Sequence, residues 1–61
     1  MHIPVTELQV GDEFPGGPIV ISLAEFGARI RVETLNPVNN YEFVDFPVRT
    51  EMVKVSRKIL A

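Results

Sequence analysis

The spacing of glycine and proline constrains this chain more than any other feature of its sequence. These residues occur at Gly11, in the segment 15–18, at Gly27, in the segment 36–40 and at Pro47. The runs between them are short and rich in Ile, Val, Phe and Thr, and they show no sustained helical period. Strands that recur about every 8–12 residues between turn signals are typical of a small all-β barrel or sandwich.

We expect five short antiparallel strands. The clearest is 28–34, where Ala28, Ile30, Val32 and Thr34 alternate with Arg29, Arg31 and Glu33, as a strand with one buried face requires. The other runs are 12–14, 19–26, 41–46 and 52–56. The predicted core consists of the apolar side chains that these runs turn inward: Ile19, Ile21, Leu23, Ile30, Val32, Val44, Phe46, Val53 and Val55.

Three further segments are predicted to be turns. Gly27 supplies the positive φ of a hairpin between the second and third runs. In 6–9, Thr6 is a capping residue, and Val5 and Leu8 have the spacing of one helical turn packed against the core. A 3₁₀ turn is expected in 47–51, before the last strand, because Pro47 fixes φ and cannot extend a β-ladder.

This layout resembles that of SH3-like small barrels. The matching features are Val10-Gly11-Asp12-Glu13-Phe14, a Gly-Gly-Pro turn, strands around Gly27, and Phe46-Pro47 ahead of Val53-Lys54-Val55. More narrowly, it resembles short uncharacterised proteins of actinobacteria and their phages. The resemblance covers about residues 8–56 and implies a five-stranded antiparallel SH3-like barrel in an accessory bacterial or phage protein. It implies a fold and not an activity.

Length and composition restrict the classes of protein that fit. A chain of 61 residues holds one domain, 1–61, whose thin core makes a homo-oligomer more favourable than usual. It contains no cysteine, and hence no disulfide or thiolate metal site. We find no apolar run long enough for a membrane span and no signal-peptide pattern after Met1. The expected location is therefore the cytoplasm, without membrane association.

The polar residues do not form a catalytic pattern. His2 is the one histidine and is expected to be solvent-exposed. Asp12 and Glu13 are expected to be a solvated strand entry, because a hard-cation site gathers more oxygen ligands than two adjacent carboxylates. The Gly-Gly-Pro turn lacks the Gly-Lys-Ser/Thr of a phosphate loop. We expect no enzyme, no catalytic or metal-binding residues, no cofactor and no small-molecule substrate.

The aromatic residues of 41–46 predict an exposed patch. Burying Asp45 unpaired would cost several kcal/mol, roughly the cost of an isolated buried charge, which favours Val44 and Phe46 inside and Tyr41 and Phe43 outside. In a hairpin around 36–40 the outward aromatics would lie beside Arg29 and Arg31. The alternative is that Phe43 belongs to the core and a β-bulge returns Glu42 to solvent.

Charge separates two hypotheses of function. Residues 1–27 carry −4 and the remainder +2, which gives a net charge of −2. We expect a non-catalytic protein-interaction or assembly module, and self-association is one of the interactions that this includes. The alternative is a nucleic-acid-binding barrel that combines stacking and charge, which the acidic total disfavours. Arg57 and Lys58, with Lys54 on the same strand, form a basic tail that is either a solvated end or a contact for a phosphate or an acidic partner. The candidate binding residues are Arg29, Arg31, Tyr41, Phe43, Lys54, Arg57 and Lys58.

Overall fold

The computed structural model describes residues 1–50 and 52–57 and is mostly β-structure. In these residues there are five strands and one 3₁₀ helix: β1 (His2–Ile3), η1 (Val5–Glu7), β2 (Ile19–Phe26), β3 (Arg29–Leu35), β4 (Tyr41–Pro47) and β5 (Val53–Lys54). All strand pairs are antiparallel, and they form a three-stranded sheet, β2-β3-β4, and a two-stranded sheet, β1-β5. The predicted small antiparallel all-β domain is confirmed.

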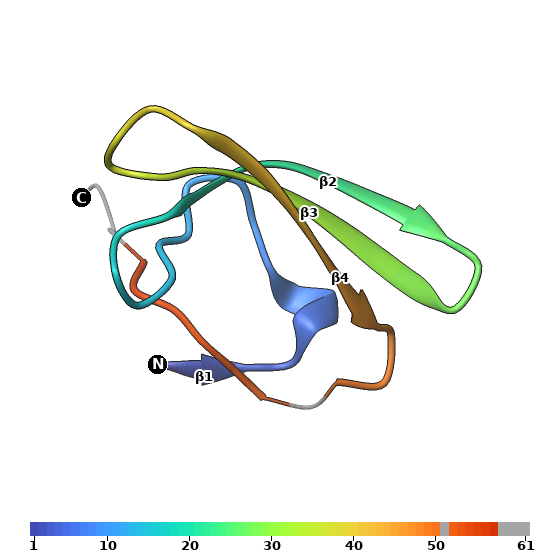
Figure 1. The fold of residues 1–61 in the computed structure, drawn as a ribbon. Coiled ribbons are helices and arrows are strands. Elements are labelled where there is room, and N and C mark those ends of the chain that lie inside the picture. Colours follow the sequence, from blue (N-terminus) through green and yellow to red (C-terminus); the bar gives the residue numbers. More distant parts are fainter. Residues whose placement is uncertain (51, 58–61) are drawn as a thin grey trace.

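The core lies between the two sheets. In Figure 1 the three-stranded sheet crosses one side of the molecule, and η1, β1 and β5 lie on the other side. Apolar side chains from both layers are buried together: Val5, Leu8, Val20, Ile30, Val32, Val53 and Val55. Glu13 connects the layers, because its main chain bridges Ile19 of β2 and Ser56 beyond β5.

The strand prediction was wrong at the N-terminus. The run 12–14 forms no strand, and only Glu13 makes isolated bridges there. The additional strand is β1, whose His2 lies opposite Lys54 of β5. β5 itself is shorter than the predicted 52–56. Over residues 1–50 and 52–57 the strands form two sheets and not one closed barrel.

The core prediction failed mainly at a β-bulge in β2. Pairing with β3 shifts between Val20 and Ser22, so the inward side changes from even to odd positions. Val20 is fully buried and Leu23 packs against the core, whereas Ile19 is 41% exposed. Ile21, at the bulge, is half-buried.

The other strands follow the prediction more closely. Ile30, Val32, Val53 and Val55 are buried as expected, and Phe46 packs at the core margin. Val44 is 40% exposed, because β4 is an edge strand and nothing in residues 1–50 and 52–57 fully covers it.

The turns are largely as predicted. Gly27 has φ +59°, as its hairpin requires. η1 buries Val5, and Leu8 follows it into the core. However, Pro4 and not Thr6 is the N-cap residue, and it makes no side-chain capping bond. Before β5, Thr50 N–H donates to the Pro47 carbonyl at 2.9 Å, which is a single hydrogen-bonded turn where a 3₁₀ turn was predicted.

Two matched substitutions test this core. Ile30→Ala should destabilise the fold by about 2–5 kcal/mol, as is usual for a buried Ile, and lower Tm by about 10 °C or more. Ile19→Ala removes the same atoms from a half-exposed position and should cost clearly less. Thermal or urea unfolding of both variants measures this difference. Equal losses would show that Ile19 is as buried as Ile30 and contradict the bulge.

Candidate interaction surface

The outer face of the three-stranded sheet brings the predicted patch together. The register places Arg31 between Ala24 of β2 and Asp45 of β4, and Glu33 opposite Phe43. Because side chains alternate between faces, Arg31, Phe43 and Asp45 share the face directed away from the core. Tyr41 lies two residues before Phe43 on the same face.

Arg31 is the centre of this face. Its Nε donates to Asp45 Oδ1 at 2.9 Å and its Nη2 donates to Asp45 Oδ2 at 3.2 Å. Its Cζ lies 5.2 Å from the ring centroid of Phe26 and 5.9 Å from that of Phe43, within the range of cation–π attraction. One guanidinium is thus held by a carboxylate and contacts two aromatic rings.

We call Phe26, Arg31, Tyr41 and Phe43 the aromatic–arginine stripe. The three aromatic side chains are 58%, 63% and 65% exposed for Phe26, Tyr41 and Phe43, respectively. Tyr41 and Phe43 point outward, so of the two alternatives that the sequence leaves open for Phe43, the exposed position is correct and the core position is wrong. β4 has an unbroken register with β3, so no bulge turns Phe43 inward.

Phe26 was missed by sequence reasoning. The run 19–26 is predicted as a strand, but no facing is assigned to its last residue. A signal was present, because a tight hairpin at Gly27 places Phe26 opposite Arg29, and Arg29 alternates with the inward Ile30. Extending that alternation through the hairpin places Phe26 on the outer face.

The stripe is close to electrically balanced. The Arg31 guanidinium lowers the pKa of Asp45, chiefly through the side-chain hydrogen bond, and the nearby Arg29 contributes to this effect. Asp45 in turn raises the pKa of Arg31. The exposed Arg29 adds a second positive charge and Glu33 a negative one, so the face offers aromatic area and a paired cation more than net charge.

Arg57, a predicted member of a basic tail, is bound to Asp12. Arg57 Nε donates to Asp12 Oδ1 at 2.7 Å and Nη2 donates to Asp12 Oδ2 at 2.8 Å. Arg57 Nη2 also donates to the Glu7 carbonyl at 3.1 Å, and Gln9 N–H donates to Asp12 Oδ2 at 2.9 Å. The Asp12 side chain is 1% exposed. The expectation that Asp12 lies in a solvated strand entry was therefore wrong, because a long-range arginine compensates its burial.

Lys54, another predicted basic residue, does not join the stripe. Lys54 is exposed on β5, in the other sheet, opposite His2. Lys58 lies outside the described residues. His2 is exposed, as predicted.

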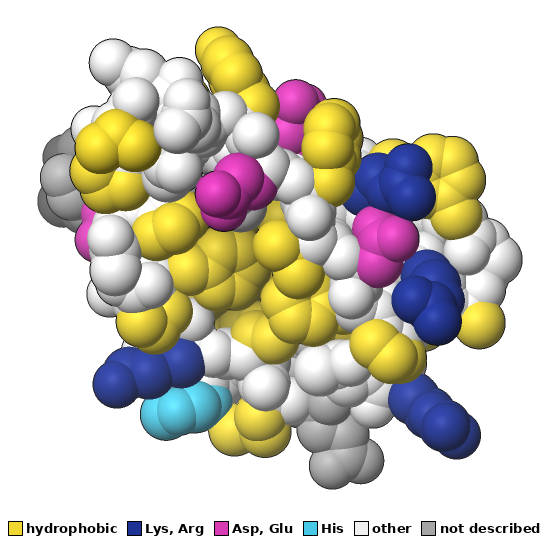
Figure 2. Space-filling model, in the orientation of Figure 1, with side chains coloured by type: hydrophobic (Ala, Val, Ile, Leu, Met, Phe, Trp, Pro, Cys, Tyr) yellow, Lys and Arg dark blue, Asp and Glu magenta, His cyan; other side chains and the backbone are white. Residues whose placement is uncertain are grey.

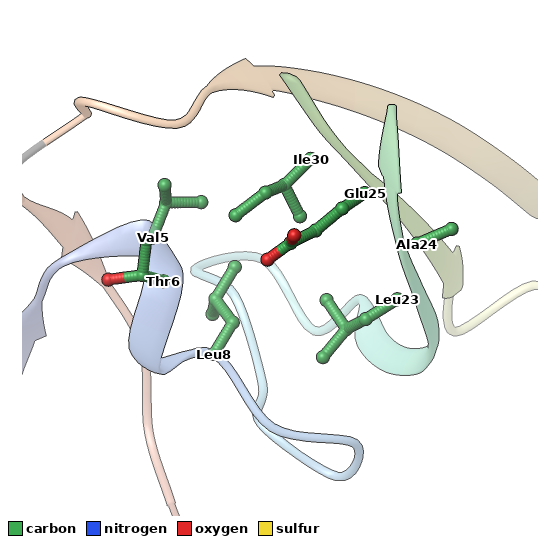
Figure 3. A pocket seen from close by; sticks show the side chains of 7 residues that line it. All are labelled: Val5, Thr6, Leu8, Leu23, Ala24, Glu25 and Ile30. Carbon is green, nitrogen blue, oxygen red and sulfur yellow. The ribbon is translucent and has the colours of Figure 1, made fainter. Parts of the chain in front are cut away.

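A small pocket opens beside the core on the opposite side of the sheet. It has a volume of about 240 Å³ and is lined by Val5, Thr6, Leu8, Leu23, Ala24, Glu25 and Ile30. Figure 3 shows the Glu25 carboxylate directed between the side chains of Leu8 and Ile30. Figure 2 shows hydrophobic side chains gathered in the middle of the face turned toward the viewer. The volume of the pocket beside the core is below the roughly 300–1,000 Å³ usual for small-molecule sites.

Among residues 1–50 and 52–57, no three His, Cys, Asp or Glu side chains lie together as a metal site would require. No helix in the same part of the chain is long and apolar enough to cross a membrane.

Comparison with known proteins identifies no relative. No family model, no curated protein and no solved structure matches this chain.

The Asp12–Arg57 pair makes a prediction about acid stability. Asp12→Asn keeps the size of the side chain but removes its charge, and should cost about 1.5–3 kcal/mol at neutral pH, the usual range for hydrogen bonds to charged groups. The pKa of Asp12 is lowered, first by the Arg57 hydrogen bond. The pair therefore stabilises the fold above the unfolded-state pKa of about 4, and this contribution disappears as the pH falls through the lower folded-state pKa.

Urea unfolding of the wild type and the variant between neutral pH and strong acid provides the measurement. Their free energies of unfolding should differ at neutral pH and converge in acid. Glu13→Gln is the matched control, because Glu13 is the adjacent carboxylate and is only half-buried. A loss at Asp12 that is no larger than the loss at Glu13 would contradict the structural role of the pair.

Proposed function

We propose that this chain is a non-catalytic protein-interaction or assembly module that binds a protein partner through the aromatic–arginine stripe. The observation that carries the proposal is the position of one exposed guanidinium between two exposed phenylalanine rings, on a hydrogen-bonded sheet. Aromatic and arginine side chains dominate the binding energy of protein interfaces.

The energetics of the stripe support binding. Arg31 is fixed by two hydrogen bonds to Asp45, so less side-chain entropy is lost when a partner covers it. Phe26 and Phe43 are on different strands that β3 holds at a fixed separation. A partner that covers both rings gains their apolar area without reorganising the sheet.

A protein partner is favoured over a nucleic acid. Asp45 occupies two of the five N–H donors of Arg31 and offsets its charge, and Glu33 lies opposite Phe43. Arg57, another candidate phosphate contact, is bound to Asp12. Binding of single strands depends on positive charge beside the stacking rings, and here much of that charge is already paired.

We also propose that the fold is a partly open SH3-like small barrel. Its support is the main chain of Glu13, which bridges β2 on one side and Ser56 on the other, and thereby continues the hydrogen bonding from one sheet toward the other. A second main-chain link joins η1 to the segment after β4, where Val5 N–H donates to the Thr50 carbonyl at 3.1 Å. This fold is compatible with many activities, so the proposed function rests on the stripe alone.

Capture experiments with matched baits test the proposed function. Immobilised wild-type protein should retain a protein from lysate of the source organism, with or without nuclease treatment. Phe26→Ala and Phe43→Ala should each weaken retention by about 5–30-fold, the equivalent of roughly 1–2 kcal/mol. Their Tm values should stay close to that of the wild type, since both rings are exposed.

Val38→Ala is the control bait, because Val38 is a strongly exposed apolar residue in the β3–β4 loop. It should retain the partner as the wild type does. Retention that nuclease abolishes would favour the nucleic-acid alternative. Equal retention by all the baits would exclude the stripe as the binding surface.

A further inference from the structure

The edge of β4 carries main-chain groups without a partner. β4 is the last strand in the order β2-β3-β4. Asn36 N–H donates to the Asn40 carbonyl and Val48 N–H donates to the Ala28 carbonyl. Hydrogen-bonded and non-hydrogen-bonded pairs alternate along an antiparallel ladder, so these two bonds show which pairs of β3 and β4 are hydrogen-bonded. Even-numbered residues of β4 therefore bond to β3, and the main chains of Tyr41, Phe43 and Asp45 point away from it. Among the described residues these three positions have no main-chain partner.

The opposite edge of the sheet is protected along its first part. At the start of β2, Gly11 N–H donates to the Val20 carbonyl and Val20 N–H donates to the Asp12 carbonyl, both at 2.8 Å. The adjacent β-bulge further interrupts that edge. Monomeric proteins commonly protect edges by covering them or by using bulges, lysines and prolines.

β4 has almost none of these protections. Its register is continuous from Tyr41 to Pro47, it contains no lysine or arginine, and Pro47 blocks only its end. Each face of β4 carries one exposed apolar side chain beside one carboxylate: Phe43 with Asp45 on the outer face, and Val44 with Glu42 on the inner face. Such an edge favours pairing with another strand.

We infer that β4 pairs antiparallel with β4 of a second copy of this chain, about a twofold axis at Phe43. Only this centre pairs the three free positions with one another: Phe43 lies opposite Phe43 of the second copy, and Tyr41 lies opposite Asp45. Each opposed pair exchanges two main-chain hydrogen bonds. A centre at Val44 would place Tyr41 opposite Pro47, which has no N–H to donate. A centre at Asp45 would instead oppose two carboxylates, and a centre at Tyr41 would leave most of the strand unpaired.

The side chains are self-complementary in this register. The Tyr41 hydroxyl faces the Asp45 carboxylate of the second copy, which accepts hydrogen bonds. On the inner face, Glu42 lies opposite Val44, so no acidic residue of β4 opposes its own copy. The two Val44 side chains are diagonal neighbours, and pairing covers the apolar surface that leaves Val44 40% exposed in one chain.

Pairing also extends the interaction surface. The sheets of the two copies become continuous. Across the outer face, the row Phe26, Arg31, Phe43 of one copy is then followed by the row Phe43, Arg31, Phe26 of the other. The inference deepens the proposed function and rests on it in one respect, since Tyr41 and Phe43 belong to both the stripe and the edge. Phe26 belongs only to the stripe, and this difference separates the two in an experiment.

Cysteine cross-linking tests the register, and the chain has no cysteine of its own. Phe43→Cys should form a disulfide-linked dimer under mild oxidation, because directly opposed Cβ atoms in a sheet are about 4.5–5.5 Å apart. Tyr41→Cys and Asp45→Cys should each cross-link poorly alone and efficiently when mixed. Val38→Cys is the control for random collision. The inference is overturned if Phe43→Cys links no faster than Val38→Cys, or if Tyr41→Cys alone links as fast as the mixture.

Sedimentation of two lysine variants separates the edge from the stripe. The wild type should be dimeric at high protein concentration and dissociate on dilution. Phe43→Lys opposes two ammonium groups at the axis and should be monomeric, whereas Phe26→Lys should dimerise as the wild type does. Loss of the dimer in both variants would assign association to the stripe and overturn the edge inference alone. A wild type that is monomeric at every concentration would also overturn it, while the capture experiment would still test the stripe.

Discussion

The buried contact between Asp12 and Arg57 is the interaction on which the rest of the structure depends. Through its carboxylate, Asp12 binds Arg57 near the end of the described chain and Gln9 in the turn after η1. Through its carbonyl it accepts a hydrogen bond from Val20 at the start of β2. One residue therefore joins the segments that hold the two sheets together. In a small chain without disulfides, this contact adds to the main-chain bridges of Glu13 and to the shared apolar core.

The exposed aromatics follow from a single polar residue. Asp45 must face solvent or a cation, and the two-residue period of a strand then turns Phe43 and Tyr41 outward with it. Arg31 lies opposite Asp45 and occupies the space between Phe43 and Phe26. The stripe is thus a consequence of the β3–β4 register. The same register leaves the main chain of the odd-numbered residues of β4 free at the edge.

This logic explains which features could be predicted from the sequence. β3 was predictable because polar and apolar residues alternate along it, and β4 because Asp45 selects its outward face. The β-bulge at Val20 was not predictable, since the residues around it are apolar on both faces and no facing costs more than another. The burial of Asp12 was hidden for a different reason. Its partner lies 45 residues away, and a pairing over that distance leaves no local pattern. Phe26 was within reach and required only that the alternation of β3 be extended through Gly27.

The pairing of β1 with β5 sets the order of events during synthesis. β2, β3 and β4 are contiguous in the chain and connected by short turns, so their sheet can begin to form as soon as they emerge from the ribosome. The inner face of this sheet cannot be covered yet, because β1 pairs through His2 with Lys54 and Asp12 is bound by Arg57. For the interval before residue 57 emerges, the apolar inner face of the sheet stays open to other chains. Closure of this domain therefore waits for the last part of the described chain.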